Sequence, residues 1–170
     1  MAKRKQIRFF LLFIGVMLIF SAFRTSLFEK VQLGRHLSND DFNVYQYYEK
    51  DDAVFALFTN QDETILGIAE RNDEGYGATT IDTDPSNAFD YIDLHDGTHY
   101  YLGLRLNHNA QQVAKIQIEG ELWSEEHILN DASNGGNRDF FFLDMYNSIE
   151  DALTIQTLDQ NDQIITSISL

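Results

Sequence analysis

The N-terminal part of the chain passes from a basic stretch to an apolar run. Residues 1–8 contain Lys3, Arg4, Lys5 and Arg8, and the run over 9–23 (FFLLFIGVMLIFSAF) has no charge and one polar side chain, Ser21. As a helix, this run is about 22 Å long at about 1.5 Å per residue, against a hydrocarbon core of about 30 Å. Flanking arginines can extend their stems toward the headgroups and reduce the mismatch. The pattern predicts a cytoplasmic tail over 1–8 and a transmembrane anchor over 9–23.

A cleaved secretory signal peptide is the alternative interpretation of the same segment, because such peptides also have a basic start and a short apolar core. Cleavage requires small residues at two nearby positions. A cut after Ala22 places Phe20 at the third position back, and a cut after Ser26 places Arg24 there. An uncleaved anchor in the cell membrane is therefore favoured over secretion. In both cases the basic cluster stays in the cytoplasm and the C-terminal portion is expected outside.

Residues 24–41 have a helical pattern that ends in a polar turn. Ser26 and Glu29 fit a capping box, and the SNDD run at 38–41 predicts the end of the helix. Apolar residues recur at helical spacing: Leu27, Val31 and Leu37. We interpret 24–41 as a juxtamembrane helix and linker, a stalk between the anchor and the domain that follows.

From Phe42 onward, apolar residues alternate with polar ones, and clusters of Asn, Asp and Gly separate the alternating segments, which is typical of strands joined by turns. The predicted strands cover 42–48, 53–59, 64–70, 77–82, 89–94, 99–107, 113–120, 139–147, 152–158 and 163–170. Residues 121–130 favour a short helix. The fold class is therefore mainly β: an acidic, extracytoplasmic, antiparallel β-sandwich over 42–170, with two sheets packed face to face.

Some segments also indicate which faces are buried. In 99–107, Tyr100, Leu102, Leu104 and Leu106 alternate with more polar residues, which predicts one buried face. Residues 140–145 are apolar on both faces, which favours a central strand covered on both sides. The last two strands are expected to form a hairpin with four inward residues: Leu153, Ile155, Ile164 and Ile168.

Charge and composition narrow the possible partners. All 27 acidic residues and eight of the 12 basic ones lie in 24–170, which gives this portion a net charge of −19. Such a field repels phosphate backbones and anionic headgroups, so we expect neither nucleic-acid binding nor flat adsorption to a bilayer. The chain has no cysteine. It therefore has no site for lipoprotein attachment and no disulfide, and the exported domain depends on its core for stability.

The order of these features resembles a family. The basic N-terminus, the short apolar segment and the acidic β domain ending in ALTIQTLDQNDQIITS (152–167) are similar to small exported, membrane-anchored, immunoglobulin-like β-sandwich proteins of Gram-positive bacteria. The resemblance implies an immunoglobulin-like fold outside the cytoplasm. It carries over no functional residue, because these proteins share no catalytic motif and a fold alone does not imply an activity.

One histidine pair suggests a metal site. His95 and His99 flank a predicted turn, and a loop of odd length preserves the alternation of inward residues on both sides of it. That loop places His95 beside His99, with Asp93 on the same outward face. Two imidazoles and a carboxylate are suitable ligands for zinc or copper. His95, His99 and Asp93 are the candidate metal ligands.

Other chemistry has weaker patterns. The acidic turns at 71–75, 82–84 and 159–162 offer oxygen ligands for calcium, but they lack the alternate acids and terminal Glu of a twelve-residue calcium loop. No nucleophile motif or phosphate-binding loop is present. Five of the eight tyrosines are candidates for an exposed contact patch: Tyr47, Tyr48, Tyr76, Tyr101 and Tyr146.

These observations lead to three functional hypotheses. The first is a non-enzymatic, membrane-tethered binding or accessory module without a cofactor, which contacts the lipid bilayer through 9–23 and an envelope protein or glycan through its β domain. The second is a cation-responsive sensor for zinc, copper or calcium. The third is an envelope hydrolase with an acidic site that has no recognisable motif.

Overall fold

The computed structural model describes residues 27–50, 53–72, 75–95, 99–129, 139–145 and 153–169. In these residues the chain forms a helix over 27–39, eleven β-strands and a short 3-10 helix, η1 (Ala110–Gln112). The predicted mainly β, antiparallel fold is confirmed. The anchor predicted over 9–23 lies outside the described residues. Within them, no helix has both the length and the hydropathy needed to cross a bilayer.

The strands form three antiparallel sheets. Sheet A has the order β1 (Phe42–Lys50), β2 (Ala53–Asn60), β3 (Ile65–Asn72), β4 (Gly75–Asp82). Sheet B has the order β5 (Phe89–His95), β6 (Tyr100–Leu106), β9 (Phe140–Met145). Sheet C has the order β11 (Ile164–Ser169), β10 (Thr154–Leu158), β7 (Lys115–Glu119), β8 (Ser124–Ile128). All ten predicted strands are present, and β8 is additional.

The helix expected over 121–130 is wrong, since β8 occupies this segment and pairs antiparallel with β7. Its side chains alternate in burial: Glu125 and His127 are partly buried, whereas Ser124, Glu126 and Ile128 are exposed. This is the period of a strand. Because the inward residues are polar, the alternation of apolar and polar types that identified the other strands is missing here.

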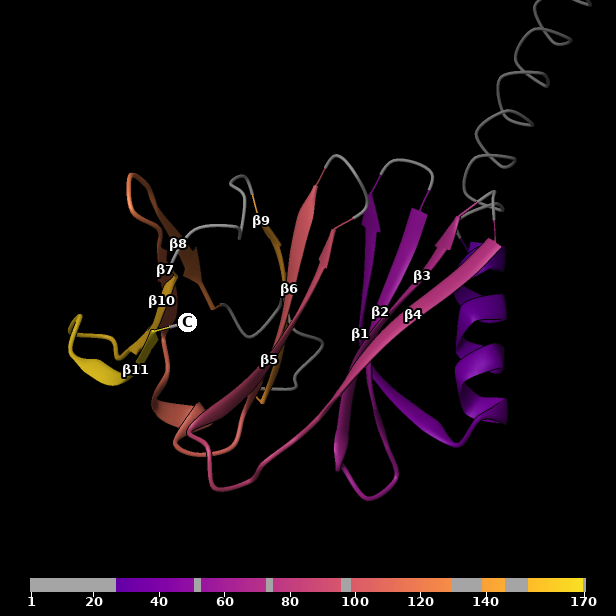
Figure 1. The fold of residues 1–170 in the computed structure, drawn as a ribbon, viewed down its shortest axis with the longest axis horizontal. Helices are drawn as coiled ribbons and strands as arrows, with labels where there is room; N and C mark the ends of the chain where they lie inside the picture. Colours follow the sequence, from indigo (N-terminus) through magenta and orange to yellow (C-terminus); the bar gives the residue numbers. More distant parts are fainter. Residues whose placement is uncertain are drawn as a thin grey trace, which may run out of the picture.

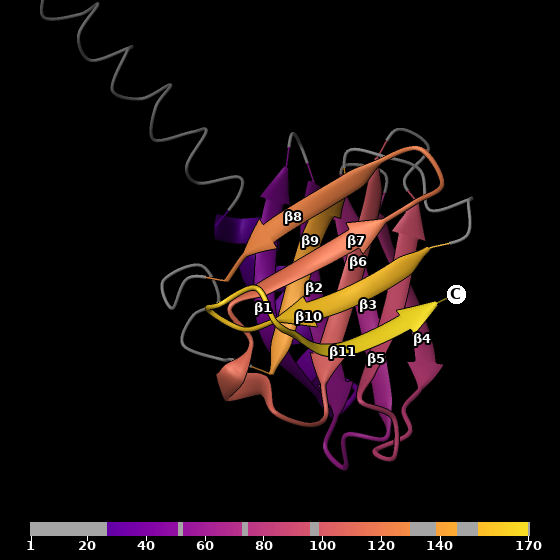
Figure 2. The same cartoon turned by 90° about the vertical axis from the view of Figure 1, so that its left-hand side faces the viewer.

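The elements are stacked in layers. Figure 1 shows the helix on the outside of sheet A, sheet B in the middle and sheet C on the far side. Figure 2 looks onto sheet C, whose strands cross in front of sheet B. The described residues from Phe42 onward therefore form three antiparallel sheets, A, B and C, and not the two facing sheets that were expected over 42–170.

The helix shares a hydrophobic core with sheet A. Leu33 and Leu37 are both 0% exposed and pack with Val54, Ala56, Phe58 and Ala69 of β2 and β3. The expectation that this helix is a stalk outside the domain is therefore corrected: two of its side chains belong to the interior. Of the three apolar positions predicted for this helix, Leu37 is buried, whereas Leu27 and Val31 are exposed. The buried side of the helix consists of Leu33 and Leu37.

Sheets A and B enclose an aromatic core. Phe55 of β2, Tyr101 of β6 and Phe142 of β9 are buried there, with ring centroids between 4.3 and 5.8 Å apart. Gly103 of β6 faces the same core, where a Cβ atom would lie 2.6 Å from Leu57 Cδ1 and 2.9 Å from Ile92 Cγ2. The absence of a side chain at Gly103 therefore allows sheets A and B to approach each other closely at this point.

Sheet B also buries its other face, against sheet C. Leu102 and Leu104 of β6 pack there with Ile116 and Ile118 of β7 and with Phe141 of β9. The predicted alternation within 99–107 is present, but the expectation of one buried face is wrong, because sheet A covers the second face. The expectation for 140–145 is confirmed in part: β9 is buried on both faces, but it is an edge strand of sheet B and not a central one.

The C-terminal hairpin pairs β10 with β11 as predicted. Leu153 and Ile155 are buried, and Ile168 packs against the same core. Ile164 was expected to point inward but is 57% exposed. The pairing shifts by one residue between Thr157 and Leu158, and this irregularity reverses the side on which the start of β11 presents its residues.

Candidate functional site

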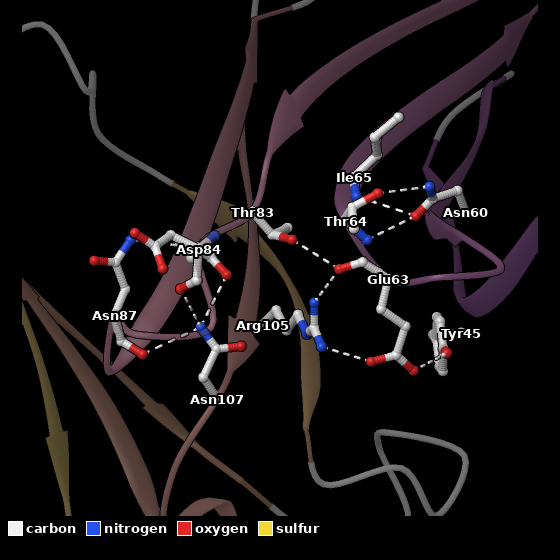
Figure 3. Close-up of polar contacts among 11 residues, drawn as sticks. Tyr45, Asn60, Glu63, Thr64, Ile65, Thr83, Asp84, Asn87, Arg105 and Asn107 are labelled. Atoms are coloured by element: carbon white, nitrogen blue, oxygen red, sulfur yellow. Dashed lines mark hydrogen bonds and ion pairs between the residues drawn. The ribbon is translucent and has the colours of Figure 1, made fainter.

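A cavity of about 580 Å³ lies where the ends of sheets A and B meet η1. It is lined by Tyr45 of β1, Glu63 of the β2–β3 turn, Pro85, Arg105 at the end of β6, the segment from Leu106 to Gln112, and Asp139 and Phe140 at the start of β9. Residues from two sheets and four connections thus converge at one end of the domain. Figure 3 shows the polar contacts around the cavity.

Glu63 owes its position to the turn that carries it. The backbone of Glu63 is left-handed, with φ of 54°, a conformation that costs a non-glycine residue of order 1 kcal/mol or more. Asn60 holds the turn, because its Oδ1 accepts hydrogen bonds from the backbone N–H groups of Thr64 at 2.8 Å and Ile65 at 3.1 Å. Its carbonyl accepts from the N–H of Glu63 at 3.1 Å. The turn therefore fixes Glu63 with local contacts (Figure 3).

Arg105 binds Glu63 through both its backbone and its side chain. One guanidinium nitrogen donates to the Glu63 carbonyl at 2.6 Å, and the other donates to Oε2 of its carboxylate at 2.5 Å. The hydroxyl of Thr83 also donates to this carbonyl, at 2.7 Å. The Arg105 side chain is 14% exposed and the Glu63 side chain 43%. The ion pair therefore joins sheet B to the β2–β3 turn with its carboxylate end toward solvent.

Aromatic rings form the wall beside this ion pair. Tyr45 stacks on Phe140, with centroids 3.8 Å apart and planes at 14°, and the Arg105 guanidinium lies 5.8 Å from the Phe140 centroid. The Tyr45 hydroxyl donates to Oε1 of Glu63 at 3.0 Å. Burial raises the pKa of Tyr45 above its ordinary value, so this hydroxyl stays protonated and remains a donor at neutral pH.

A second polar network supports the wall on the side of the β4–β5 connection. Asn107 Nδ2 donates to Asp90 Oδ2 at 2.9 Å and to the carbonyls of Asp84 and Asn87, each at 3.2 Å. Asp90 is 5% exposed, and its Oδ1 accepts from the Asp84 N–H at 3.2 Å. Asn107 therefore ties the end of β6 to this connection, and the cavity wall is held from both sides.

The rim of the cavity is rich in carboxamides. Asn109, at the N-cap of η1, has φ of 57° and begins a turn that exposes Gln111 and Gln112. Carboxamides both donate and accept hydrogen bonds. The lining therefore combines an aromatic wall, the Glu63–Arg105 ion pair and carboxamides with the side chains of His108 and Asp139. This set of groups is suited to a polar ligand with many hydroxyls.

The predicted metal ligands do not come together. His95 is paired with Tyr100 across the hairpin and stacks on its ring at 4.1 Å, whereas the His99 ring lies 6.2 Å from Tyr101. Tyr100 and Tyr101 are consecutive and point to opposite faces of the sheet. The odd-length loop is wrong, because the last pair leaves four residues, 96–99, between the strands. Across the described ranges, no group of three or more His, Cys, Asp or Glu residues is arranged to hold a metal ion.

Two of the acidic turns have a structural role. Asp159 Oδ1 accepts hydrogen bonds from the N–H groups of Asn161 at 2.7 Å and Gln163 at 2.9 Å, and these bonds lower the pKa of Asp159. The Asp84 carboxylate accepts from the N–H of Ser86, and hydrogen bonds from Ser86 lower the pKa of Asp84. Both carboxylates thus stabilise their own turns.

The tyrosines expected to form one contact patch are dispersed. Tyr101 is 1% exposed, Tyr48 donates to Asp144 at 2.7 Å between sheets A and B, and Tyr47 is partly buried beneath Lys30 of the helix. Tyr76 alone among the described four is exposed, beside His36. Tyr146 lies outside the described residues. The structure therefore does not support a tyrosine patch.

Tyr45, Glu63, Arg105 and Asn107 are site residues that the sequence pattern did not predict. One local signal was available: Asn60 and Thr64 flank Glu63 in the pattern N-Q-D-E-T, which favours a side-chain-capped turn. The meeting of Glu63 with Arg105, 42 positions later, depends on how sheets A and B stack. No protein-family model, no curated protein and no solved structure matches this chain.

Proposed function

We propose that this chain is a membrane-tethered, extracytoplasmic binding module, anchored in the lipid bilayer through residues 9–23, and that the cavity beside Glu63 and Arg105 binds an envelope glycan. The observation that carries the proposal is the preformed cavity itself. Its walls are fixed by the Asn60 turn, the Glu63–Arg105 pair and the Asn107 network before any ligand arrives. A site that is ordered in advance loses little conformational freedom on binding.

The chemistry of the lining favours a neutral, hydroxyl-rich ligand. The rim supplies carboxamides from Asn109, Gln111 and Gln112, which match hydroxyls as both donors and acceptors. Tyr45 and Phe140 supply apolar surface beside them. The net charge of −19 of residues 24–170 disfavours anionic ligands. A neutral oligosaccharide meets all three conditions.

A binding role is favoured over hydrolysis of the same ligand. Glu63 Oε1 accepts from Tyr45 and Oε2 accepts from Arg105, so both oxygens of this carboxylate already have donors. We therefore assign Glu63 to the architecture of the site and propose that the chain is not an enzyme.

We also infer that β5 to β11 form an immunoglobulin-like sandwich. In chain order, β5 to β11 correspond to the seven strands that are conventionally lettered A to G in an immunoglobulin domain. The counterparts of strands A, B and E are β5, β6 and β9, which form one sheet, and the counterparts of strands C, F and G are β7, β10 and β11, which lie in the other. That division is the one found in constant-type immunoglobulin domains, except that β8 joins the C strand instead of the E strand. The strand order therefore supports the family resemblance, with sheet A and the helix as additions.

Titration calorimetry of the full-length chain in detergent micelles tests the glycan. The probes are uncharged oligomers of N-acetylglucosamine and of glucose. We expect saturable binding to at least one, weakened at least tenfold by the double substitution Gln111→Ala and Gln112→Ala, a loss of about 1.4 kcal/mol or more. Gln163→Ala, at an exposed position before β11, is the matched control and should leave the affinity unchanged.

Two results decide against parts of the proposal. If no uncharged oligomer gives a heat of binding, the proposal that the ligand is a neutral glycan is wrong. If cross-linking from position 111 recovers one specific envelope protein, the ligand is a protein and not a glycan. Membrane fractionation of the producing cell tests the tether: the chain should be in the membrane pellet and resist extraction with carbonate. Full-length chain in the cytosol, or a shortened chain in the medium, contradicts the anchor.

A further inference from the structure

We propose that the first helical turn, through Leu27, Phe28 and Val31, lies in the headgroup region of the bilayer and holds the domain with its cavity facing away from the membrane. This inference rests on the anchor of the proposed function. It adds a second lipid contact, made by the folded domain itself, and a fixed orientation in place of a free tether.

The helix is attached firmly enough to transmit an orientation. Leu33 and Leu37 are fully buried against sheet A. In its first turn, Lys30 donates to Glu49 at 2.5 Å and lies 5.4 Å from the centroid of the Tyr47 ring. Further along, His36 makes an edge contact with Tyr76 of β4 at 4.1 Å. Contacts to both edge strands of sheet A thus prevent the helix from pivoting on the sheet.

Three large apolar side chains of this helix lie outside the core that Leu33 and Leu37 share with sheet A. Leu27 is 60% exposed, Phe28 59% and Val31 50%. Val31 follows Leu27 by four positions and Phe28 by three, so all three lie on one side of the helix. They place three exposed apolar side chains together on one side of the N-terminal end of the helix, and such a cluster is typical of a contact with a partner or a membrane.

The position of this surface along the chain identifies its partner as lipid. The apolar run ends at Phe23, and only Arg24, Thr25 and Ser26 separate it from Leu27. Four peptide steps extend at most about 14 Å at about 3.6 Å each. The headgroup region adds about 5 to 8 Å on each side of the hydrocarbon core. If Phe23 lies at the edge of the hydrocarbon, Leu27 lies within or just above the headgroups.

The charge of the domain restricts the contact to this turn. Residues 24–170 carry a net charge of −19, which opposes a broad approach to a surface with anionic lipids. A small apolar contact is compatible with such repulsion, whereas a domain lying flat on the bilayer is not. We therefore expect the domain to stand on its helical end.

The cavity is at the other end of the domain. Lys30 contacts Glu49 near the end of β1, whereas Phe42 at the start of β1 pairs with Asn60 beside the turn that carries Glu63. A strand of nine residues is about 30 Å long. Figure 1 shows the same arrangement, with the β2–β3 turn and η1 at the end of the domain opposite the last residues of β1. The cavity therefore faces the cell envelope beyond the membrane.

Site-specific fluorescence on the full-length chain tests this orientation. Because the natural chain has no cysteine, single substitutions Val16→Cys, Phe28→Cys and Asp62→Cys each accept one NBD label. The chain is reconstituted in phosphatidylcholine vesicles that contain lipids with nitroxides in the headgroup or deep in the acyl chain. We expect deep quenching at 16, headgroup quenching at 28, and several-fold weaker quenching of either kind at 62.

The three positions separate the possible failures. Without quenching at 16, the anchor itself is wrong. With quenching at 16 but not at 28, the anchor stands and the lipid contact of the helix is overturned. Equal headgroup quenching at 28 and 62 overturns the orientation, since the domain then lies flat.

A second measurement tests the role of the apolar surface without relying on a label within it. The triple substitution Leu27→Ser, Phe28→Ser and Val31→Ser changes exposed side chains, so circular dichroism should show an unchanged fold. The fluorescence anisotropy of a label at 62 in vesicles should fall, because the domain gains rotational freedom about its tether. Unchanged anisotropy contradicts the proposal.

Discussion

Arg105 binds Glu63 twice, at its carbonyl and at its carboxylate, although the two residues lie 42 positions apart. Arg105 belongs to sheet B, and Glu63 lies in a turn of sheet A. The pair therefore closes the gap between two sheets at one end, and the same contact forms part of the cavity wall. The contact between the two sheets and the wall of the candidate site therefore both include the guanidinium group of Arg105.

Replacement of Arg105 by alanine should weaken both the contact between sheets A and B and the wall of the cavity. The loss of two charge-assisted hydrogen bonds in a mostly buried position should lower the free energy of unfolding by about 1.5 to 3 kcal/mol. Urea unfolding of the full-length chain in micelles measures this change. Arg35→Ala on the exposed side of the helix is the control and should change stability by less than about 0.5 kcal/mol. Equal effects of the two substitutions contradict a special role for Arg105.

The fold was predictable where local pattern decides it. Strands such as β2 and β3 have apolar runs bounded by Asn-rich and Asp-rich turns, and these signals located them to within about two residues. The number of layers was not predictable in this way. Tyr101 and Gly103 look like outward positions of an alternating strand, yet both are buried, because sheet A covers them. The third layer depends on packing between sheets, so it cannot be predicted from the residue pattern of any single strand.

The candidate site was even less accessible from the sequence. Asp93 and His95 are two positions apart in β5 and share one face, but the register of the hairpin places His99 nearer to Tyr101, whose side chain points to the opposite face. Glu63 and Asn107 were each visible as ordinary turn residues. Their common position at the cavity follows from long-range packing of sheets A and B, which periodicity does not specify.

Gly103 should tolerate no side chain. An added Cβ meets Leu57 and Ile92 within 3 Å, so Gly103→Ala forces sheets A and B apart or their side chains out of place. We expect a loss of about 1 to 3 kcal/mol in unfolding free energy. Gly77 of β4 is the matched control, because nothing lies within 4 Å of its Cβ position. Gly77→Ala should be neutral or slightly stabilising in the same urea titration.

The helix should contribute to global stability and not only to tethering. Leu37→Ala removes a fully buried side chain from the core that the helix shares with β2 and β3, so the free energy of unfolding should fall by about 2 to 5 kcal/mol. Val31→Ala, at a half-exposed position of the same helix, should cost less than about 0.5 kcal/mol in micelles. If Leu37→Ala melted the helix alone, amide exchange in sheet A would stay unchanged and contradict this view.

His127 should make the stability of the domain fall at mildly acidic pH. Burial lowers the pKa of this imidazole from its ordinary value of 6.5, although Glu125, with Oε2 3.6 Å from Nε2, opposes the shift. The unfolded chain therefore binds a proton at higher pH than the folded chain does. Stability is retained above pH 6.5 and is lost progressively as the pH falls from there toward the lower folded pKa.

Two measurements check this pH dependence. The His127 ring signals in proton NMR should titrate with a midpoint below 6.5. His127→Gln, which cannot gain a charge, should flatten the decline of unfolding free energy between about pH 6.5 and 5, whereas His108→Gln at an exposed position should leave it in place. A midpoint above 6.5 would mean that the attraction of Glu125 outweighs burial, and stability would then rise on mild acidification.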